Sequence, residues 1–326
     1  MEIREIDRGQ KMSSTIGVSI GRRGLCSSSR LANVLKARAG QSIVWMAPCA
    51  QAFKSDTATM GSNFAFHNEV DPTFFAGDAV PERATTIVVS AQQVSKPFLQ
   101  AWRERYSEEK LTLVRRGTSL GSIDLDAAKG LGINVLCTPG INSPHVAKFV
   151  VDTLGLSETA SSVTKAVVIG SGSVGQCIIS LLNGVGVRPT VVNRSPESPS
   201  LESAFRDATH VAVCAATSSE PIIKLPQIKE LLAGEARAIK ICSVSRPEAF
   251  SLEAIMMVAQ RKEPTELRFD YGDSILAPTR ERVNQKGVQE NITWSSNAMA
   301  SEACKADMDE AVLRLFAQTS VRSECS

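Results

Sequence analysis

The feature that most constrains this chain is a glycine-rich hexapeptide that directly follows an apolar, strand-like run. Residues 164–169 read TKAVVI, and GSGSVG at residues 170–175 then opens the helical pattern VGQCIISLLNGVG. A G-x-G-x-x-G pattern is weak evidence alone, but between a strand and a helix it is typical of a Rossmann unit that binds a dinucleotide. The sequence therefore predicts an α/β fold with such a unit in its second half.

The spacing of the three glycines gives each one a physical role. Gly170 allows a tight turn, Gly172 lets the backbone approach a pyrophosphate, and Gly175 lets the helix pack closely on the strand. The amino end of the helix attracts phosphate because its amides are unpaired and its dipole is positive there. We therefore expect a cofactor-binding loop formed by Gly170, Gly172, Ser173, Val174 and Gly175.

The next strand-like run, PTVVNRS, indicates which dinucleotide binds. An NAD-binding unit usually ends this strand with an acid that accepts a hydrogen bond from the ribose 2′-hydroxyl. Here the strand ends in Asn193, Arg194 and Ser195, without an acid. A planar guanidinium matches a 2′-phosphate, so Arg194, assisted by its two neighbours, favours NADP over NAD. The alternative is that Arg194 is an ordinary solvated surface residue.

Strand-like and helical runs alternate regularly from residue 164 onward. The six strand-like runs are TKAVVIG, PTVVNRS, THVAVCAAT, AIKICSVS, ELRFDYG and NITWSS, with helical patterns between them. This alternation predicts a doubly wound parallel sheet.

The first part of the chain shows a similar but less regular rhythm. We expect strands in STIGVSI, QSIVWMAP, ATTIVVSA, LTLVRRG and INVLCTP, and helices in SSRLANVLKARAG and KPFLQAWRERYSEEK. A chain of 326 residues is long for one core, so two α/β domains are expected. Residues 51–83 interrupt the rhythm with unevenly spaced Gly, Asn, Pro and Phe, which suggests a mobile flap or a surface insertion.

The chain closes with a helical pattern at residues 300–317. Its apolar positions fall on one face, which must be buried against another part of the molecule. These positions are Ala303, Met308, Ala311, Val312 and Leu315.

Composition and charge argue against several classes of protein. The net charge is +2 and no basic block is interleaved with aromatic residues, so nucleic acid is not an expected partner. No apolar run approaches the roughly 20 residues that span a bilayer, and the first residues are charged, so we expect a cytoplasmic protein without a membrane partner. The eight cysteines are scattered without a C-x-x-C pair, which predicts reduced thiols and no metal site.

The segment SIDLDAAKGLGINVLCTPGINSPHVAKFV, followed by the glycine loop, resembles the D-isomer-specific 2-hydroxyacid dehydrogenase family. The order of features agrees with that family from about Leu111 to Glu302. The resemblance implies two Rossmann-like doubly wound domains, with the cofactor domain inserted into the substrate domain and the last helix returning to the first lobe. On this basis we expect a flavodoxin-like substrate domain at residues 1–143 and 298–326, and a dinucleotide-binding domain at residues 144–297.

The resemblance also assigns residues to the site. The family has an Arg after the fourth crossover that grips the substrate carboxylate, and the segment AIKICSVSRPEAFSLEAI puts Arg246 in that role. A bidentate guanidinium suits it because it orients a carboxylate and polarises the adjacent carbonyl. The alternative is a surface pair with Glu248. Asp270 corresponds to a strand-end Asp near the nicotinamide, and Thr217 to a loop Thr beside the cofactor.

The catalytic pair of the family is absent. Where the family carries its proton-donating His after the last strand, this chain reads WSSN at residues 294–297, and an Asn side chain does not exchange a proton near neutral pH. The Glu that assists that His would fall near Ile275, where the nearest carboxylate is Asp273. We therefore expect Asn297 and Asp273 at the catalytic position beside Arg246. The candidate substitute donors are Tyr271, Asp273, His145 and a water held by Ser296 and Asn297.

The region that forms the dimer in the family is shortened. Between Lys148 and Gly170 this chain has a short helix and the linker SETASSVT in place of a long helix and an arm. A homo-oligomer, with a dimer as the first expectation, would then use another surface. The family's glycine pair before ID is kept only in part at residues 117–121, so the backbone cradle for the substrate carboxylate is expected to differ.

Together these features predict an NADP-dependent oxidoreductase that transfers a hydride to or from a small carboxylate, a 2-oxo or 2-hydroxy acid or a related imine, in specialised biosynthesis. An imine or an activated carbonyl suits a site without the His because it can arrive protonated. Two alternatives stay open. One is a catalytically inactive NADP(H)-binding regulatory or scaffold protein. The other is an enzyme of the amino-acid dehydrogenase or cyclodeaminase type, which would need Lys148 or Lys240 at the site.

Overall fold

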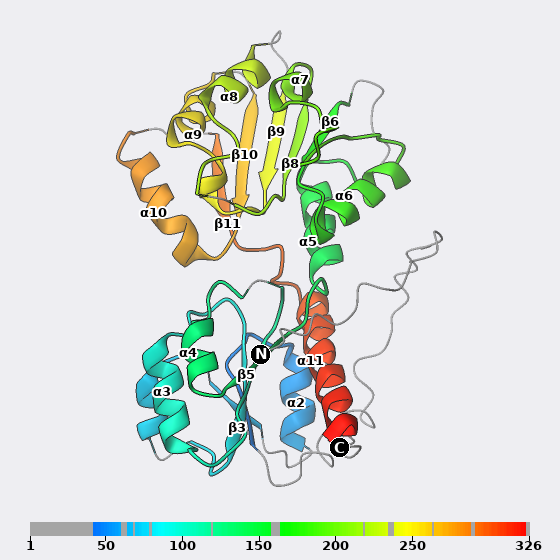
Figure 1. The fold of residues 1–326 in the computed structure, drawn as a ribbon. Helices are drawn as coiled ribbons and strands as arrows, with labels where there is room; N and C mark the ends of the chain where they lie inside the picture. Colours follow the sequence, from blue (N-terminus) through cyan, green and yellow to red (C-terminus); the bar gives the residue numbers. More distant parts are fainter. Residues whose placement is uncertain are drawn as a thin grey trace.

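The protein consists of two helix-covered parallel sheets in two halves that lie one above the other (Figure 1). This computed structural model describes residues 42–59, 64–67, 69–77, 80–118, 120–157, 164–217, 219–233, 238–262, 264–287 and 291–323. The expected strand at residues 14–20 and the expected helix at residues 28–40 lie outside these ranges. The α/β class with two Rossmann-like sheets is confirmed.

The sheet of the N-terminal half has the strand order β2-β1-β3-β4-β5 within the described residues, and every pair is parallel. This is the order of flavodoxin-like folds. The β-branched runs expected to form strands from residue 42 onward do so. The helix expected at residues 96–110 is α3, which begins at Lys96 as expected and ends earlier, at Arg105. The elements are β1 (Ser42–Trp45), β2 (Phe64–Phe66), β3 (Ala84–Val89), α3 (Lys96–Arg105), β4 (Thr112–Arg115), α4 (Leu125–Gly130) and β5 (Asn134–Cys137).

The expectation that residues 51–83 form a flap or a surface insertion is wrong. This stretch contains α2 (Gln51–Thr59), the edge strand β2 and the 3-10 helix η1 (Pro72–Ala76). Phe53 and Phe75 are buried in the two apolar clusters on either side of the sheet. The expectation failed because these elements pack through unevenly spaced aromatic rings, so neither a helical nor a strand period appears in the sequence.

The sheet of the C-terminal half has the order β11-β10-β9-β8-β6-β7, again with parallel pairs throughout. All six strands expected from the alternating pattern are confirmed. They are β6 (Ala166–Ile169), β7 (Thr190–Val192), β8 (His210–Val213), β9 (Ile239–Ser243), β10 (Thr265–Asp270) and β11 (Ile292–Ser295). The helical elements are α5 (Ser143–Thr153), α6 (Ser173–Gly184), α7 (Leu201–Phe205), α8 (Leu225–Leu232), η2 (Pro247–Ala249), α9 (Leu252–Ala259) and α10 (Asp273–Asn284).

The last helix, α11 (Glu302–Ser323), returns to the N-terminal half and lies beside α2 (Figure 1). Its buried side chains join β1, β3 and β4 in one apolar cluster, as the resemblance implied. Met308, Val312 and Leu315 are buried as expected, whereas Ala303 is exposed and Ala311 is only half-buried. The buried positions are Cys304, Met308, Asp309, Val312, Leu313, Leu315 and Phe316.

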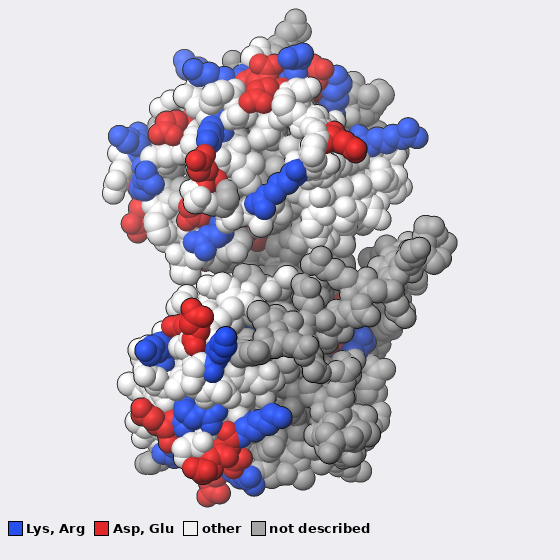
Figure 2. All heavy atoms as spheres, viewed as in Figure 1, with Lys and Arg blue, Asp and Glu red and all other residues white. Residues whose placement is uncertain are grey.

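Because all strands within each sheet are parallel, the carboxyl ends of the strands all lie at the same edge of that sheet. The two edges meet where the halves adjoin: a Cβ atom on Gly140, after β5, would lie 3.9 Å from Oγ of Ser173 at the start of α6. The molecular surface narrows at this level on the side of α10 and α4 (Figure 2). Both regions therefore consist of loops that follow strands. We call the one in the N-terminal half (after β3, β4 and β5) the N-terminal edge, and the one in the C-terminal half (after β6 to β11) the C-terminal edge.

Candidate functional site

The glycine loop after β6 is shaped by close backbone contacts. Gly170 has a φ of +108°, and a Cβ atom there would lie 2.7 Å from the backbone nitrogen of Ala215. A Cβ atom on Gly175 would lie 2.1 Å from the carbonyl oxygen of Gly170. Only glycine fits either position, because a real Cβ would collide with backbone atoms that cannot move aside.

The middle glycine of the loop faces open space. Among the described residues, no neighbouring atom lies within 4 Å of a Cβ built on Gly172, which is the N-cap residue of α6. Gly172 has no side chain to cap the helix, and Ser173 is exposed while Val174 is half-buried. The amides of the first turn therefore point to a region that a pyrophosphate could occupy, and the residues present fit a dinucleotide.

The turn after β7 is held in shape by its own polar groups. The backbone amide of Asn193 donates to Oγ of Ser198 at 2.9 Å, and the amide of Ser195 donates to Oδ1 of Asn193 at 2.8 Å. Arg194 is exposed at this turn, and no carboxylate of the described residues forms an ion pair with it. The turn thus presents a guanidinium whose charge is unpaired within the described part of the chain.

The loops after β8 and β9 carry two further residues expected at the site. Thr217 is half-buried after β8, and Oγ of Ser245 after β9 donates to the carbonyl of Ala215 at 2.7 Å, which ties the two loops together. Arg246 follows as the N-cap residue of η2, and 46% of its side chain is exposed. Its Nε lies 3.3 Å from Oε2 of Glu248.

Asp270, at the end of β10, is buried and fully engaged with the chain itself. It is 5% exposed and accepts hydrogen bonds from Oγ of Ser295 at 2.8 Å, from the amide of Asn297 at 2.7 Å and from the amide of Ala298 at 3.0 Å. The carboxylate therefore fixes the backbone where the chain leaves β11 for the N-terminal half. Asn297 and Ser296 themselves are exposed at the same edge.

Two of the expected substitute proton donors are occupied by ion pairs. Oδ1 of Asp273 lies 2.9 Å from Nη1 of Arg280, and 71% of the Asp273 side chain is exposed. Nε2 of His145 lies 2.8 Å from Oδ2 of Asp307 on α11. The first contact lies within α10, and the second joins α5 to α11.

The two lysines required by the alternative of an amino-acid dehydrogenase lie elsewhere. Lys240 belongs to the amino-terminal part of β9, and its Nζ lies 3.4 Å from a Cβ built on Gly155. Lys148 pairs with Asp152 along α5 at 2.6 Å, with 61% of its side chain exposed. Neither lies at the C-terminal edge.

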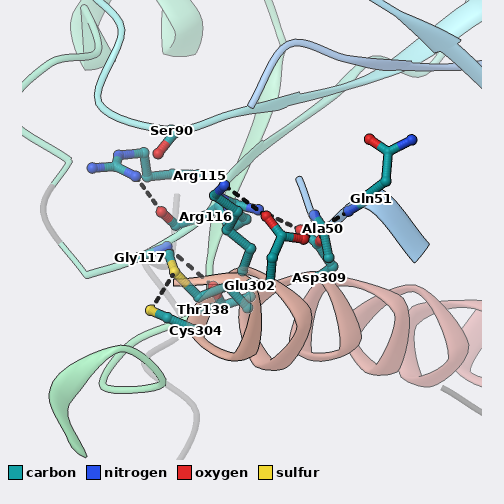
Figure 3. A network of polar contacts seen from close by, with 12 residues as sticks. Ala50, Gln51, Ser90, Arg115, Arg116, Gly117, Thr138, Glu302, Cys304 and Asp309 are labelled. Carbon is teal, nitrogen blue, oxygen red and sulfur yellow. Dashed lines mark hydrogen bonds and ion pairs between the residues drawn. The ribbon is translucent and has the colours of Figure 1, made fainter. Parts of the chain in front are cut away.

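The N-terminal edge carries a polar network that the sequence did not reveal (Figure 3). The amide of Gly117 donates to Oγ1 of Thr138 at 3.1 Å, and the amide of Gly140 donates to Oγ1 of Thr118 at 3.0 Å. These bonds join the loops after β4 and β5. Arg116, directly after β4, is 3% exposed and forms an ion pair with Asp309.

Asp309 connects this network to α11. It also accepts a hydrogen bond from the backbone amide of Ala50 at 2.8 Å. Burial raises the pKa of Asp309 to about 6, although the attraction of Arg116 acts in the opposite direction. The sequence did carry a signal of this ion pair, because Asp309 lies between apolar positions of the last helix. A buried acid needs a charged partner, so a basic residue was to be expected beside it.

Two classes of feature are not found in the described part of the chain. No group of three or more His, Cys, Asp and Glu side chains there could hold a metal ion. No helix there is both long and apolar enough to cross a bilayer.

Comparisons with known proteins identify the fold. No family model matches the sequence, and no curated protein sequence matches it. Among solved structures, a D-2-hydroxyisocaproate dehydrogenase matches with a TM-score of 0.67 and 16% identity, over 85% of this chain and 95% of that one. The D-lactate dehydrogenase of Escherichia coli matches with a TM-score of 0.66 and 15% identity, over 84% and 95%.

A third match is 3-phosphoglycerate dehydrogenase of Entamoeba histolytica, solved with NAD+ bound, with a TM-score of 0.61 and 16% identity over 85% of this chain and 95% of that one. The chain is thus a two-domain α/β protein with a doubly wound sheet in each half. More narrowly, it has the fold of the D-2-hydroxyacid dehydrogenases.

Proposed function

We propose that this protein is an NADP-dependent oxidoreductase that transfers a hydride to or from a small carboxylate, a 2-oxo or 2-hydroxy acid or a related imine. The observation that carries the proposal is the uncapped amino end of α6 behind a glycine loop in which Gly172 leaves open space. When bound, a nicotinamide dinucleotide would supply the hydride chemistry. The dehydrogenase names of the structural neighbours, one of them solved with NAD+, agree with this class of reaction.

The preference for NADP rests on the turn after β7. Asn193, Arg194 and Ser195 offer a guanidinium with flanking polar groups, which suits a 2′-phosphate, and they lack the carboxylate that usually accepts from a free 2′-hydroxyl. The turn is already formed by its internal hydrogen bonds, so little ordering is needed on binding. The amides of the glycine loop would hold the pyrophosphate, with Thr217 and the Asp270 region near the other end of the cofactor.

The substrate carboxylate would bind Arg246. Its contact with Glu248 is an exposed pair that uses only Nε, and such pairs contribute about 0–1 kcal/mol. A substrate can therefore take the two terminal nitrogens in a bidentate contact. Asn297, exposed beside this edge, could hold the substrate oxygen by a hydrogen bond, and Asp273 is the nearest exposed acid.

The proposal is tested by substituting Arg194 and measuring binding of both cofactors by calorimetry. Arg194→Ala should weaken NADPH binding by more than about tenfold and leave NADH binding nearly unchanged, because only NADPH carries the extra phosphate. Arg188→Ala is a matched control, since Arg188 is an exposed arginine just before the same strand, at its other end. Equal losses for both cofactors would remove the argument for NADP.

The inactive regulatory protein is the second candidate function, and the absence of the family's His is the observation that favours it. Wild-type protein mixed with NADPH and a panel of 2-oxo acids and imines should consume the absorbance of the reduced nicotinamide if it is an enzyme. Binding without consumption would favour the inactive protein. We also propose that the protein is cytoplasmic and acts in biosynthesis. We propose further that it is a homodimer formed by a surface other than the family's arm, and light scattering tests its oligomeric state.

A further inference from the structure

Two consecutive arginines at the end of β4 have different surroundings. Arg116 forms a buried ion pair with Asp309 of α11. Arg115 donates from Nη1 to the carbonyl of Arg116, and no carboxylate of the described residues pairs with it. Figure 3 shows the two guanidinium groups on opposite sides, with Arg115 beside Ser90. The sheet register agrees, because Val89, the residue before Ser90, lies opposite Arg115. Within the described part of the chain, only one of the two charges is therefore neutralised.

The guanidinium of Arg115 packs against the loop that follows β4. A Cβ atom built on Gly117 would lie 3.2 Å from Nη1 of Arg115 and 3.7 Å from its Cζ. Gly117 has a φ of +123°, so a residue with a side chain would be strained there. Nε of Arg115 is buried without a hydrogen-bond partner among the described residues, but the residue as a whole is half-buried. The charge is therefore held in place by the chain and is still within reach of a ligand.

Several backbone amides of the N-terminal edge are already bonded within the chain. The amides of Gly117 and Gly140 donate to threonine hydroxyls. The amide of Thr138 donates to the carbonyl of Arg115 at 3.2 Å, and that of Ser90 donates to a glutamine side chain at 2.7 Å. These amides are not free to cradle a carboxylate. An anion at this edge would therefore be met by the guanidinium of Arg115, which carries a full charge and keeps free N–H groups.

The loop after β4 is joined to the cofactor loop of the other half. Thr118 accepts a hydrogen bond from the amide of Gly140, and Gly140 adjoins Ser173 at the start of α6. Arg246, the residue proposed to bind the substrate carboxylate, follows β9 at the opposing edge. Arg115 and Arg246 thus offer one guanidinium on each of the two edges that meet. A small acid with an anionic group at each end can contact both.

We propose that Arg115 binds a second anionic group of the substrate, which is then a 2-oxo or 2-hydroxy acid with a further carboxylate or a phosphate at its other end. This inference rests on the proposed function. The carboxylate beside the reacting carbon binds Arg246, and the distal group accepts hydrogen bonds from Arg115, with the hydroxyl of Ser90 as a further donor. Such a charge-assisted contact is strong in a partly buried place because water screens it less. Arg115 is thus a specificity-determining residue and takes no part in the hydride transfer.

The first test compares acids that differ only in the distal group. One pair is 2-oxopentanedioate with 2-oxopentanoate, and the other is 3-phosphooxy-2-oxopropanoate with 3-hydroxy-2-oxopropanoate, each mixed with NADPH. In wild type, kcat/KM for the dianion should exceed that for its partner by about tenfold or more in one of the pairs. The pair that shows the difference identifies the distal group as carboxylate or phosphate. Equal values within both pairs would overturn the proposal.

The same measurement on variants assigns the preference to Arg115. Arg115→Gln should lower kcat/KM for the preferred dianion by about 10- to 100-fold and leave that of its partner within about threefold of wild type. Arg115→Lys keeps the charge without the planar fork, so its value should lie between the two. Arg105→Gln is a matched control that should change neither acid, because Arg105 is exposed at the end of α3, before the amino end of β4.

Turnover of the partner acid by Arg115→Gln shows that this variant is folded. An equal loss for both acids would mean that Arg115 acts on the fold or on the carboxylate that both acids carry. That result would contradict a second anionic group.

The second test needs neither cofactor nor turnover. The same acids are titrated by calorimetry into wild type and Arg115→Gln without a nicotinamide. Wild type should bind the preferred dianion about tenfold more tightly than its partner, and Arg115→Gln should lose most of this difference. A difference of the same size in both proteins would show that another group selects the dianion.

The two tests separate the failures. If wild type neither binds NADPH nor reduces any of these acids, the proposed function fails, while a preference for the dianion that depends on Arg115 still supports the anion site. If wild type reduces both members of each pair equally well, the oxidoreductase stands and only the role of Arg115 fails.

Discussion

The two edges that meet between the halves differ in whether their polar groups are bonded to other residues of the chain. At the N-terminal edge, the amides of Gly117 and Gly140 are bonded to threonine hydroxyls, and Arg116 is neutralised by Asp309. At the C-terminal edge, the amino end of α6 has no side-chain cap and Arg194 has no ion pair within the described residues. These exposed groups bond to water, which a ligand can displace, so the edge that keeps several of them suits the binding of a ligand.

Arg115 is the exception at the N-terminal edge. It has no carboxylate partner within the described residues, and its Nε is buried there without a hydrogen-bond partner. The comparison thus separates two roles: polar groups that stabilise the fold, and polar groups left for a dinucleotide.

The largest expected effect comes from breaking the buried ion pair between Arg116 and Asp309 at the N-terminal edge. Asp309→Ala leaves Arg116 buried without its partner, which should lower the free energy of unfolding by about 3–5 kcal/mol. Chemical denaturation measures this change. Lys148→Ala, which breaks the exposed pair with Asp152, is the control and should change stability by no more than about 0.5 kcal/mol. Equal small losses in both variants would show that this pair does not hold α11.

Two substitutions in the glycine loop separate an effect on stability from an effect on ligand binding. Gly175→Ala would place a methyl group against the carbonyl of Gly170, which should lower the free energy of unfolding by about 3 kcal/mol. Gly172→Ala meets no neighbouring atom and should cost less than about 1 kcal/mol. NADPH affinity of Gly172→Ala should still fall by about tenfold or more, because the methyl group occupies the approach to the pyrophosphate. Unchanged affinity in a stable Gly172→Ala variant would place the dinucleotide elsewhere.

The smallest expected effect is a pH dependence of the N-terminal edge. The folded protein keeps a proton on Asp309, whose pKa is about 6, over a pH range in which an unfolded Asp, with a pKa of about 3.9, has released it. Folded protein then binds more protons than unfolded protein between about pH 4 and about pH 6, so this group's contribution to stability falls as pH rises.

Denaturation of wild type and Asp309→Ala across that range measures the effect. The stability of wild type relative to the variant should fall by about 2 kcal/mol from the acidic to the neutral end. A difference that stays constant with pH, or grows as pH rises, would mean that Asp309 is ionised in the folded protein throughout.

The parts of the fold that follow a regular period were predictable from the sequence. The central strands β6, β8 and β9 appear as apolar runs because they are buried on both faces. The glycine loop appears because its backbone contacts admit no side chain at Gly170 and Gly175. The elements between Gln51 and Ala76 were missed because aromatic rings, rather than a period, hold them. On α11 the burial of Met308, Val312 and Leu315 was predicted, but that of Asp309 was not, because a search for apolar positions passes over an acid.

The site was predictable where the contacts are local. The turn at Asn193 to Ser198 is built from neighbouring residues, and its lack of an acid is visible in the sequence. The engagement of Asp270 was not visible, because its partners lie 25 to 28 residues further along the chain. The difference between Arg115 and Arg116 depends on Asp309 of α11, which is far away in the sequence, so two adjacent arginines carry no local sign of it.

The most direct test of the central claim is a calorimetric titration of the wild-type protein with NADPH and with NADH. The account predicts saturable binding of NADPH to one site per chain, at least about tenfold tighter than NADH, since the guanidinium at the turn after β7 meets the extra phosphate. Absence of measurable binding for both dinucleotides would contradict it.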